Sequence, residues 1–135
     1  MSQKHVFISA AQAMTEEFKG RTNHWLCRPE IANCKDLQIC RATLPPGEGH
    51  DFHTHPELEE VLYVLEGQLE QWVEKEKKIL NPGELAVIPA GVVHASFNPT
   101  DKDVMFLAIL SPAAAKGPFA VDVSGEEPWK SLRKK

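Results

Sequence analysis

Polar and apolar residues of this chain alternate in short runs, and helical periodicity is hard to find after residue 20. Ten prolines and eight glycines separate these runs, and turn residues at such intervals are typical of short strands. The predicted strands cover residues 23–27, 37–44, 51–55, 60–65, 68–73, 77–80, 85–88, 94–97 and 104–110. So many short strands predict an all-β sandwich or barrel.

Both ends of the chain have a different character. Ser9 to Gln12 have the form of a capping box, which predicts one short helix over Ala10–Phe18 closed by Gly20. Residues 111–135 are richer in Ala, Gly and Pro and form a C-terminal tail. Apolar residues recur in this tail, so we expect residues 119–123 to dock on the barrel or on a partner subunit and residues 132–135 to be frayed.

Composition limits the classes of protein that fit. A length of 135 residues and 42% hydrophobic residues predict a single globular domain over residues 1–135, with its barrel core at about 37–110. Fifteen Lys and Arg against nineteen Asp and Glu give a net charge of -4, the wrong sign for a nucleic-acid partner. The longest apolar run, Val104–Leu110, is far shorter than the roughly twenty residues of a membrane span.

The cell compartment is inferred from two further features. The apolar run Val6–Ala11 is interrupted by Ser9 and is too short for the core of a secretory signal. Cys27, Cys34 and Cys40 are odd in number and form no CxxC motif, so reduced thiols are expected. We therefore expect a cytoplasmic protein.

Candidate chemistry is concentrated in four residues. His53 and His55 form an H-x-H pair, and the period of two in a strand places both imidazoles on one face. Glu60 follows across a turn containing Pro56, and His94 comes from a separate strand. Three imidazoles and one carboxylate suit one Fe, Mn, Ni or Zn ion per chain and leave open coordination positions. His50 has the opposite parity in a regular strand and is left out of this set.

A substrate pocket needs further side chains beside the metal. The candidates are polar or soft residues on otherwise apolar strands, namely Gln38, Cys40, Arg41 and Gln71, together with His24, Trp25 and Trp72. The two tryptophans are more typical of a core or an interface. Strand parity does not decide whether Gln38 and Cys40 face inward or Ile39 and Arg41 do. An inward Arg41 would imply an anionic substrate, and an inward Cys40 would leave a largely apolar pocket. No catalytic side chain is assigned.

The spacing of these residues resembles the two motifs of the cupin superfamily. The first block has Gly47, His53, His55, Glu60 and Gly67, with five, one, four and six residues between them. The second block has Gly83, then Pro89-Ala90-Gly91, then His94 and Asn98. The resemblance implies an antiparallel jelly-roll barrel with the metal held inside by His53, His55, Glu60 and His94.

Two functions are compatible with this resemblance. One is a metal-dependent enzyme of dioxygenase, decarboxylase or isomerase type that acts on a small oxygenated organic molecule. The other is a metal-containing module that binds or senses a sugar or small acid without turnover. In addition, Val61–Leu65 and Val104–Leu110 do not alternate, so both faces of these strands should be covered, which predicts a homodimer.

Overall fold

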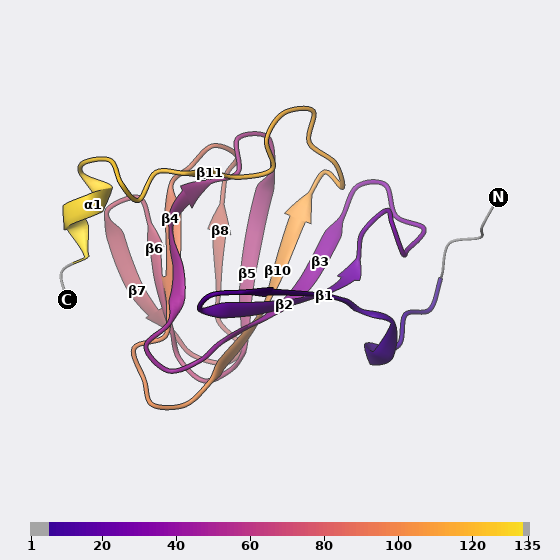
Figure 1. Cartoon of the computed structure of the whole chain (residues 1–135), viewed down its shortest axis with the longest axis horizontal. Coiled ribbons are helices and arrows are strands. Elements are labelled where there is room, and N and C mark those ends of the chain that lie inside the picture. Colours follow the sequence, from indigo (N-terminus) through magenta and orange to yellow (C-terminus); the bar gives the residue numbers. More distant parts are fainter. Residues whose placement is uncertain (1–5, 134–135) are drawn as a thin grey trace.

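The computed structural model describes residues 6–133, and almost all of its regular structure is antiparallel β-sheet (Figure 1). One sheet has six strands in the order β1-β2-β3-β10-β5-β8, and the other has five in the order β11-β4-β9-β6-β7. The strands are β1 (Met14–Phe18), β2 (Arg21–Cys27), β3 (Gln38–Leu44), β4 (Gly49–Thr54), β5 (Glu59–Glu66), β6 (Leu69–Val73), β7 (Glu76–Leu80), β8 (Leu85–Ile88), β9 (His94–Phe97), β10 (Val104–Ser111) and β11 (Val121–Asp122). All nine strands expected from the sequence are present, and the all-β prediction is confirmed.

The two sheets pack around a shared apolar core. In β3 and β10 every second residue is buried, so one face of the six-stranded sheet points inward. Leu62 and Val64 of that sheet belong to the same buried cluster as Leu69 and Leu80 of the other sheet. No strand pair joins the sheets within residues 6–133, so this barrel is open along its seams.

The N-terminal helix prediction is wrong over most of its length. A 3₁₀ turn, η1, covers only Ala10–Gln12, although the Ser9 backbone N–H does donate to Gln12 Oε1 at 2.8 Å. The residues that follow form β1, which pairs with β2 from Met14 opposite Trp25 to Phe18 opposite Arg21. Gly20, with φ of 94°, completes the turn of this hairpin rather than ending a helix. Pairing with β2 outweighs the local helical signal because it supplies both hydrogen bonds and a buried neighbour.

The C-terminal tail docks as expected. Its strand β11 pairs with β4, Val121 lying opposite Thr54 and Asp122 opposite His53. The tail ends in a short helix, α1 (Trp129–Leu132), which lies at the far side of the molecule from the N-terminus in Figure 1.

Fraying of the last residues is contradicted where the structure describes them. Leu132 belongs to α1 and packs on a second apolar cluster, and Arg133 donates to both carboxylate oxygens of Glu70, at 2.6 and 3.2 Å. Lys134 and Lys135 lie outside the described residues. The second apolar cluster holds Leu132 and the buried carboxylate of Glu70 holds Arg133, so these two residues are fixed where the sequence predicted fraying. Among residues 6–133, none of the helices has the length and apolar character to cross a membrane.

Candidate metal centre

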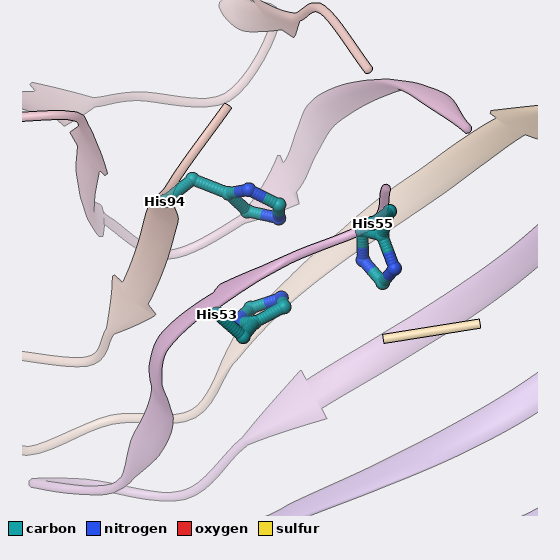
Figure 2. Close-up of side chains that lie close together, drawn as sticks. All are labelled: His53, His55 and His94. Carbon is teal, nitrogen blue, oxygen red and sulfur yellow. The ribbon is translucent and has the colours of Figure 1, made fainter. Parts of the chain in front are cut away.

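Three histidines meet at the inner face of the five-stranded sheet. His53 lies in β4 opposite His94 of β9, and His55 follows directly after β4. All three are at most 5% exposed, and one nitrogen from each lies within 4.8 Å of the others. Figure 2 shows His53 and His55 on one segment and His94 on the neighbouring strand, with their rings close together. This group could hold a metal ion.

A main-chain carbonyl fixes the orientation of each ring. His53 Nδ1 lies 2.6 Å from the carbonyl oxygen of Asp51, and His94 Nδ1 lies 3.0 Å from that of Val92. His55 Nδ1 lies 2.9 Å from the carbonyl oxygen of Phe119, in the tail. A carbonyl only accepts, so each neutral ring carries its proton on Nδ1 and keeps the Nε2 lone pair free. Metal-ligating histidines are oriented in this way.

Glu60 brings a carboxylate to the same point. It lies in β5, is 6% exposed, and its Oε1 is 2.9 Å from His94 Nε2 and 3.3 Å from His55 Nε2. Despite this proximity, neither Glu60 Oε1 nor His94 Nε2 has a hydrogen-bond partner among the described residues. Two buried polar atoms without partners are costly. A divalent cation fits there, because it would be bound by both atoms at once.

Burial and neighbouring charges set the pKa values of the cluster. Burial would raise the pKa of Glu60, but the imidazoles of His55 and His94 outweigh it and hold that pKa well below its usual range. Burial would lower the pKa of His55, but the carboxylate of Glu60 outweighs it and raises that pKa. For His53, burial lowers the pKa, and the neighbouring imidazole of His50 acts in the same direction. Glu60 is therefore ionised and His53 neutral near pH 7.

His50 does not point away from this site, contrary to the parity argument. The pairing of β4 with β9 shifts register between His50 and His53, so the strand is irregular there. The His50 ring stacks on the His53 ring with centroids 3.6 Å apart, and His50 lines the same cavity as the cluster. Burial, followed by the charge of Arg21, lowers the pKa of His50 to about 3. His50 is thus a neutral neighbour of the histidine cluster.

The cluster forms part of the lining of a cavity of about 500 Å³. Of the expected pocket residues, Cys40 reaches the cavity and Arg41 does not, since Gln38 and Cys40 are buried on the inner face of β3. Gln38 and Gln71 are also buried but do not line the cavity. The side chain of Gln71 accepts a hydrogen bond from Ser96, which is itself a lining residue. Much of the remaining wall is apolar, with side chains such as Leu62 and Phe106.

Most of the opposite wall was missed by the sequence analysis, which considered only Trp25 among its residues. The β1–β2 hairpin places five residues that share one face against the cavity: Glu16, Phe18, Arg21, Asn23 and Trp25. The alternation of Arg21, Asn23 and Trp25 in β2 is the signal that could have identified them. It was uninformative while the preceding segment was taken as a helix.

Comparison with known proteins agrees with the fold and the motifs. The profile of the cupin domain family matches residues 40–110. Germin-like protein 12-2 of Oryza sativa subsp. japonica is 32% identical over 103 residues, covering 68% of this chain and 44% of that protein. A germin-like protein of Morus alba is 32% identical over 82 residues, covering 56% of this chain and 39% of that protein. The chain thus spans less than half the length of these curated relatives.

Solved structures share the fold at lower identity. The polyketide cyclase RemF from Streptomyces resistomycificus superposes with a TM-score of 0.74 at 19% identity, covering 98% of both chains. KdgF from a Halomonas species superposes with a TM-score of 0.71 at 20% identity, covering 82% of this chain and 96% of that one. These likenesses concern the fold alone, whereas the family profile covers more than half of the sequence. This chain belongs to the cupin domain family.

Proposed function

We propose that this protein is a metal-dependent enzyme acting on a small oxygenated organic molecule, by dioxygenase, decarboxylase or isomerase chemistry. The observation that carries the proposal is the buried Oε1 of Glu60, which has no hydrogen-bond partner among the described residues although His55 Nε2 and His94 Nε2 lie 3.3 and 2.9 Å from it. The third histidine of the cluster, His53, lies beside them. The cluster lies beside a cavity large enough for a small molecule.

The ligands of one divalent metal per chain would be His53, His55, Glu60 and His94. Fe, Mn, Ni and Zn all accept this donor set. When bound, such an ion supplies Lewis-acid or redox chemistry to an oxygen-bearing molecule. The chain itself holds the imidazole of His53 neutral and keeps Glu60 ionised, which are the protonation states that metal binding requires of these two ligands.

The apolar residues of the lining would keep water away from the reacting centre. Leu62, Phe106, Ala108 and Leu110 present apolar side chains from the six-stranded sheet to the cavity. An apolar wall strengthens electrostatic interactions at the histidine side because it keeps the local dielectric low.

The test begins with metal analysis of protein purified without added metal. We expect close to one transition-metal ion per chain, with His94→Ala losing it and His24→Ala keeping it. His24 is a matched control because its side chain contacts Thr15 and does not line the cavity. Oxygen uptake and product formation are then screened over small acids, diketones and phenols. Metal retention by His94→Ala would refute the ligand set.

Absence of turnover would overturn the enzyme proposal. If the metal-loaded protein bound small molecules from this screen but converted none of them, the site would be a binding or sensing module. A cytoplasmic location belongs to the proposal as well, supported by the free thiols of Cys27, Cys34 and Cys40.

A homodimer is proposed from the outer face of the six-stranded sheet. Leu65 of β5 and Leu85 and Val87 of β8 are 37%, 48% and 55% exposed there. A second copy of the chain would cover these side chains. Light scattering at micromolar concentration should therefore give about twice the 15.1 kDa mass of one chain, and a clean monomer would refute the dimer.

A further inference from the structure

Arg21 is an arginine in the lining of the histidine cavity whose positive charge has no carboxylate close to it. It lies at the start of β2, opposite Phe18, and its guanidinium carbon sits 4.0 Å above the centre of the Phe18 ring. Within residues 6–133, no carboxylate oxygen lies within 4.0 Å of its nitrogens, the ion pairs being formed by other residues. The ring positions the guanidinium without neutralising it.

The second arginine of the cavity is compensated. Arg28 lies 4.3 Å above the centre of the Trp25 ring, and its nitrogens lie 4.0 Å from Glu16 and 3.5 Å from Glu30. Glu16 also accepts a hydrogen bond from the indole N–H of Trp25. Glu16, the one acidic side chain that the β1–β2 hairpin directs into the cavity, is thus held by Arg28 and Trp25, while Arg21 feels it only at longer range.

Arg21 lines the same cavity as His53, His55 and His94, so its charge faces the space into which the proposed metal site opens. Glu60, the other acidic lining residue, is committed to His55 and His94. A bound divalent ion together with the negative charge of Glu60 has a net charge of +1, and Arg21 adds a second positive charge to the cavity. Such a cavity favours an anion over a neutral molecule.

We propose that the cavity takes a small organic acid whose carboxylate is bound by the guanidinium of Arg21 while its other oxygen-bearing end faces the histidines. This inference rests on the proposed function and specifies its substrate class. The planar guanidinium matches a carboxylate through two parallel hydrogen bonds. Asn23, two residues along the same face of β2, adds an amide beside that carboxylate, and the apolar wall receives the carbon chain.

The test is calorimetric titration of malonate, succinate and glutarate, each against its uncharged diamide. Zinc-loaded and metal-free protein are both titrated. We expect at least one diacid to bind at least tenfold more tightly than its diamide, and Arg21→Gln to lose about tenfold or more of that affinity. Arg21→Lys, which keeps the charge without the paired geometry, should retain part of it.

Arg41→Gln is the matched control. It removes the same charge from β3, but Arg41 lies on the outward face opposite Leu107 and His24, and does not line the cavity. Diacid affinity should be unchanged in this variant. Metal content and melting temperature of every variant are measured first, and Arg21→Lys alone serves the comparison if Arg21→Gln does not fold.

Two results would overturn the inference: equal binding of diacids and diamides by the unsubstituted protein, or diacid binding by the Arg21 variants that equals that of Arg41→Gln. Failure of the proposed function is a different result, namely no metal in the unsubstituted protein. The metal-free titration still decides the role of Arg21 in that case, since the guanidinium does not depend on the ion.

Discussion

The tail residue Phe119 links the C-terminal segment to the proposed metal site. Deleting the tail therefore tests whether this contact orients the metal ligand His55. The carbonyl oxygen of Phe119 accepts from His55 Nδ1 at 2.9 Å, and the Phe119 ring packs edge-on against the His55 ring with centroids 4.9 Å apart. Deleting residues 117–135 removes both contacts. The His55 ring then loses the group that fixes its tautomer and its orientation.

The expected loss in metal affinity is about 10- to 100-fold, the usual effect of removing an outer partner of a ligating histidine. This corresponds to roughly 1.4–2.8 kcal/mol at this one ligand. Competition with a chromophoric chelator measures the affinity directly, at a pH where His55 is deprotonated in both proteins.

A shorter deletion separates this effect from loss of stability. Removing residues 125–135 deletes α1 and Arg133 but keeps Phe119, the β11–β4 pairing and the anchoring of Gly117 by Glu57 at 2.6 Å. This variant should have a lower melting temperature than the full chain and bind metal with the same affinity. Equal metal affinity in the full chain and the 117–135 deletion would refute the role assigned to the tail.

Three further predictions concern pH and packing. Because His55 has a raised pKa and must lose its proton to bind metal, affinity should start to fall at a pH above 6.5 as the pH is lowered, and an affinity independent of pH from 8 to 5.5 would contradict this. Arg133→Gln should cost about 2 kcal/mol near pH 7, less than a fully buried pair because Arg133 is partly exposed. Burial would raise the pKa of Glu70, but Arg133 and then Trp72 outweigh it and lower that pKa. The ionised carboxylate of Glu70 therefore stabilises the folded protein above the unfolded pKa of about 4.5, and this stabilisation is lost as the pH falls through the lower folded pKa. Urea denaturation should show a smaller difference in free energy of unfolding between the unsubstituted protein and Arg133→Gln at pH 3 than at pH 7. Phe52→Ala should cost about 3–5 kcal/mol, since the ring is 1% exposed, and a loss under 1 kcal/mol would mean that the cluster repacks.

The local sequence pattern was sufficient to predict the strands that alternate with turn residues and the residues that have a fixed motif spacing. Nine strands could be predicted because Pro and Gly turns separate most of them, as Asn81 to Gly83 do between β7 and β8. The four residues proposed as metal ligands could be expected to lie close together because motif spacing restricts where they lie in the barrel. The structure brings His53, His55, Glu60 and His94 together as that spacing implies.

The alternation of side chains along a strand predicted the wrong face, or no face, where the strand was irregular or its neighbouring strands were unknown. His50 turns inward because β4 shifts register against β9, and a single bulge reverses the face of every residue before it. Likewise, the choice between Cys40 and Arg41 was settled by packing of β3 between β2 and β10, not by any feature of β3 itself.

The sequence by itself therefore determined nine strands, the all-β class and the four clustered side chains, because these follow from short-range periodicity and fixed spacing, but it determined neither β1 nor β11. Only the tertiary structure placed the β1–β2 hairpin over the cavity and the Phe119 carbonyl on His55, which lies 64 residues earlier in the chain. Such contacts join distant segments, and the backbone of Phe119 acts there whatever its side chain. No local pattern encodes them, because their energy arises only when the two sheets and the tail are packed together.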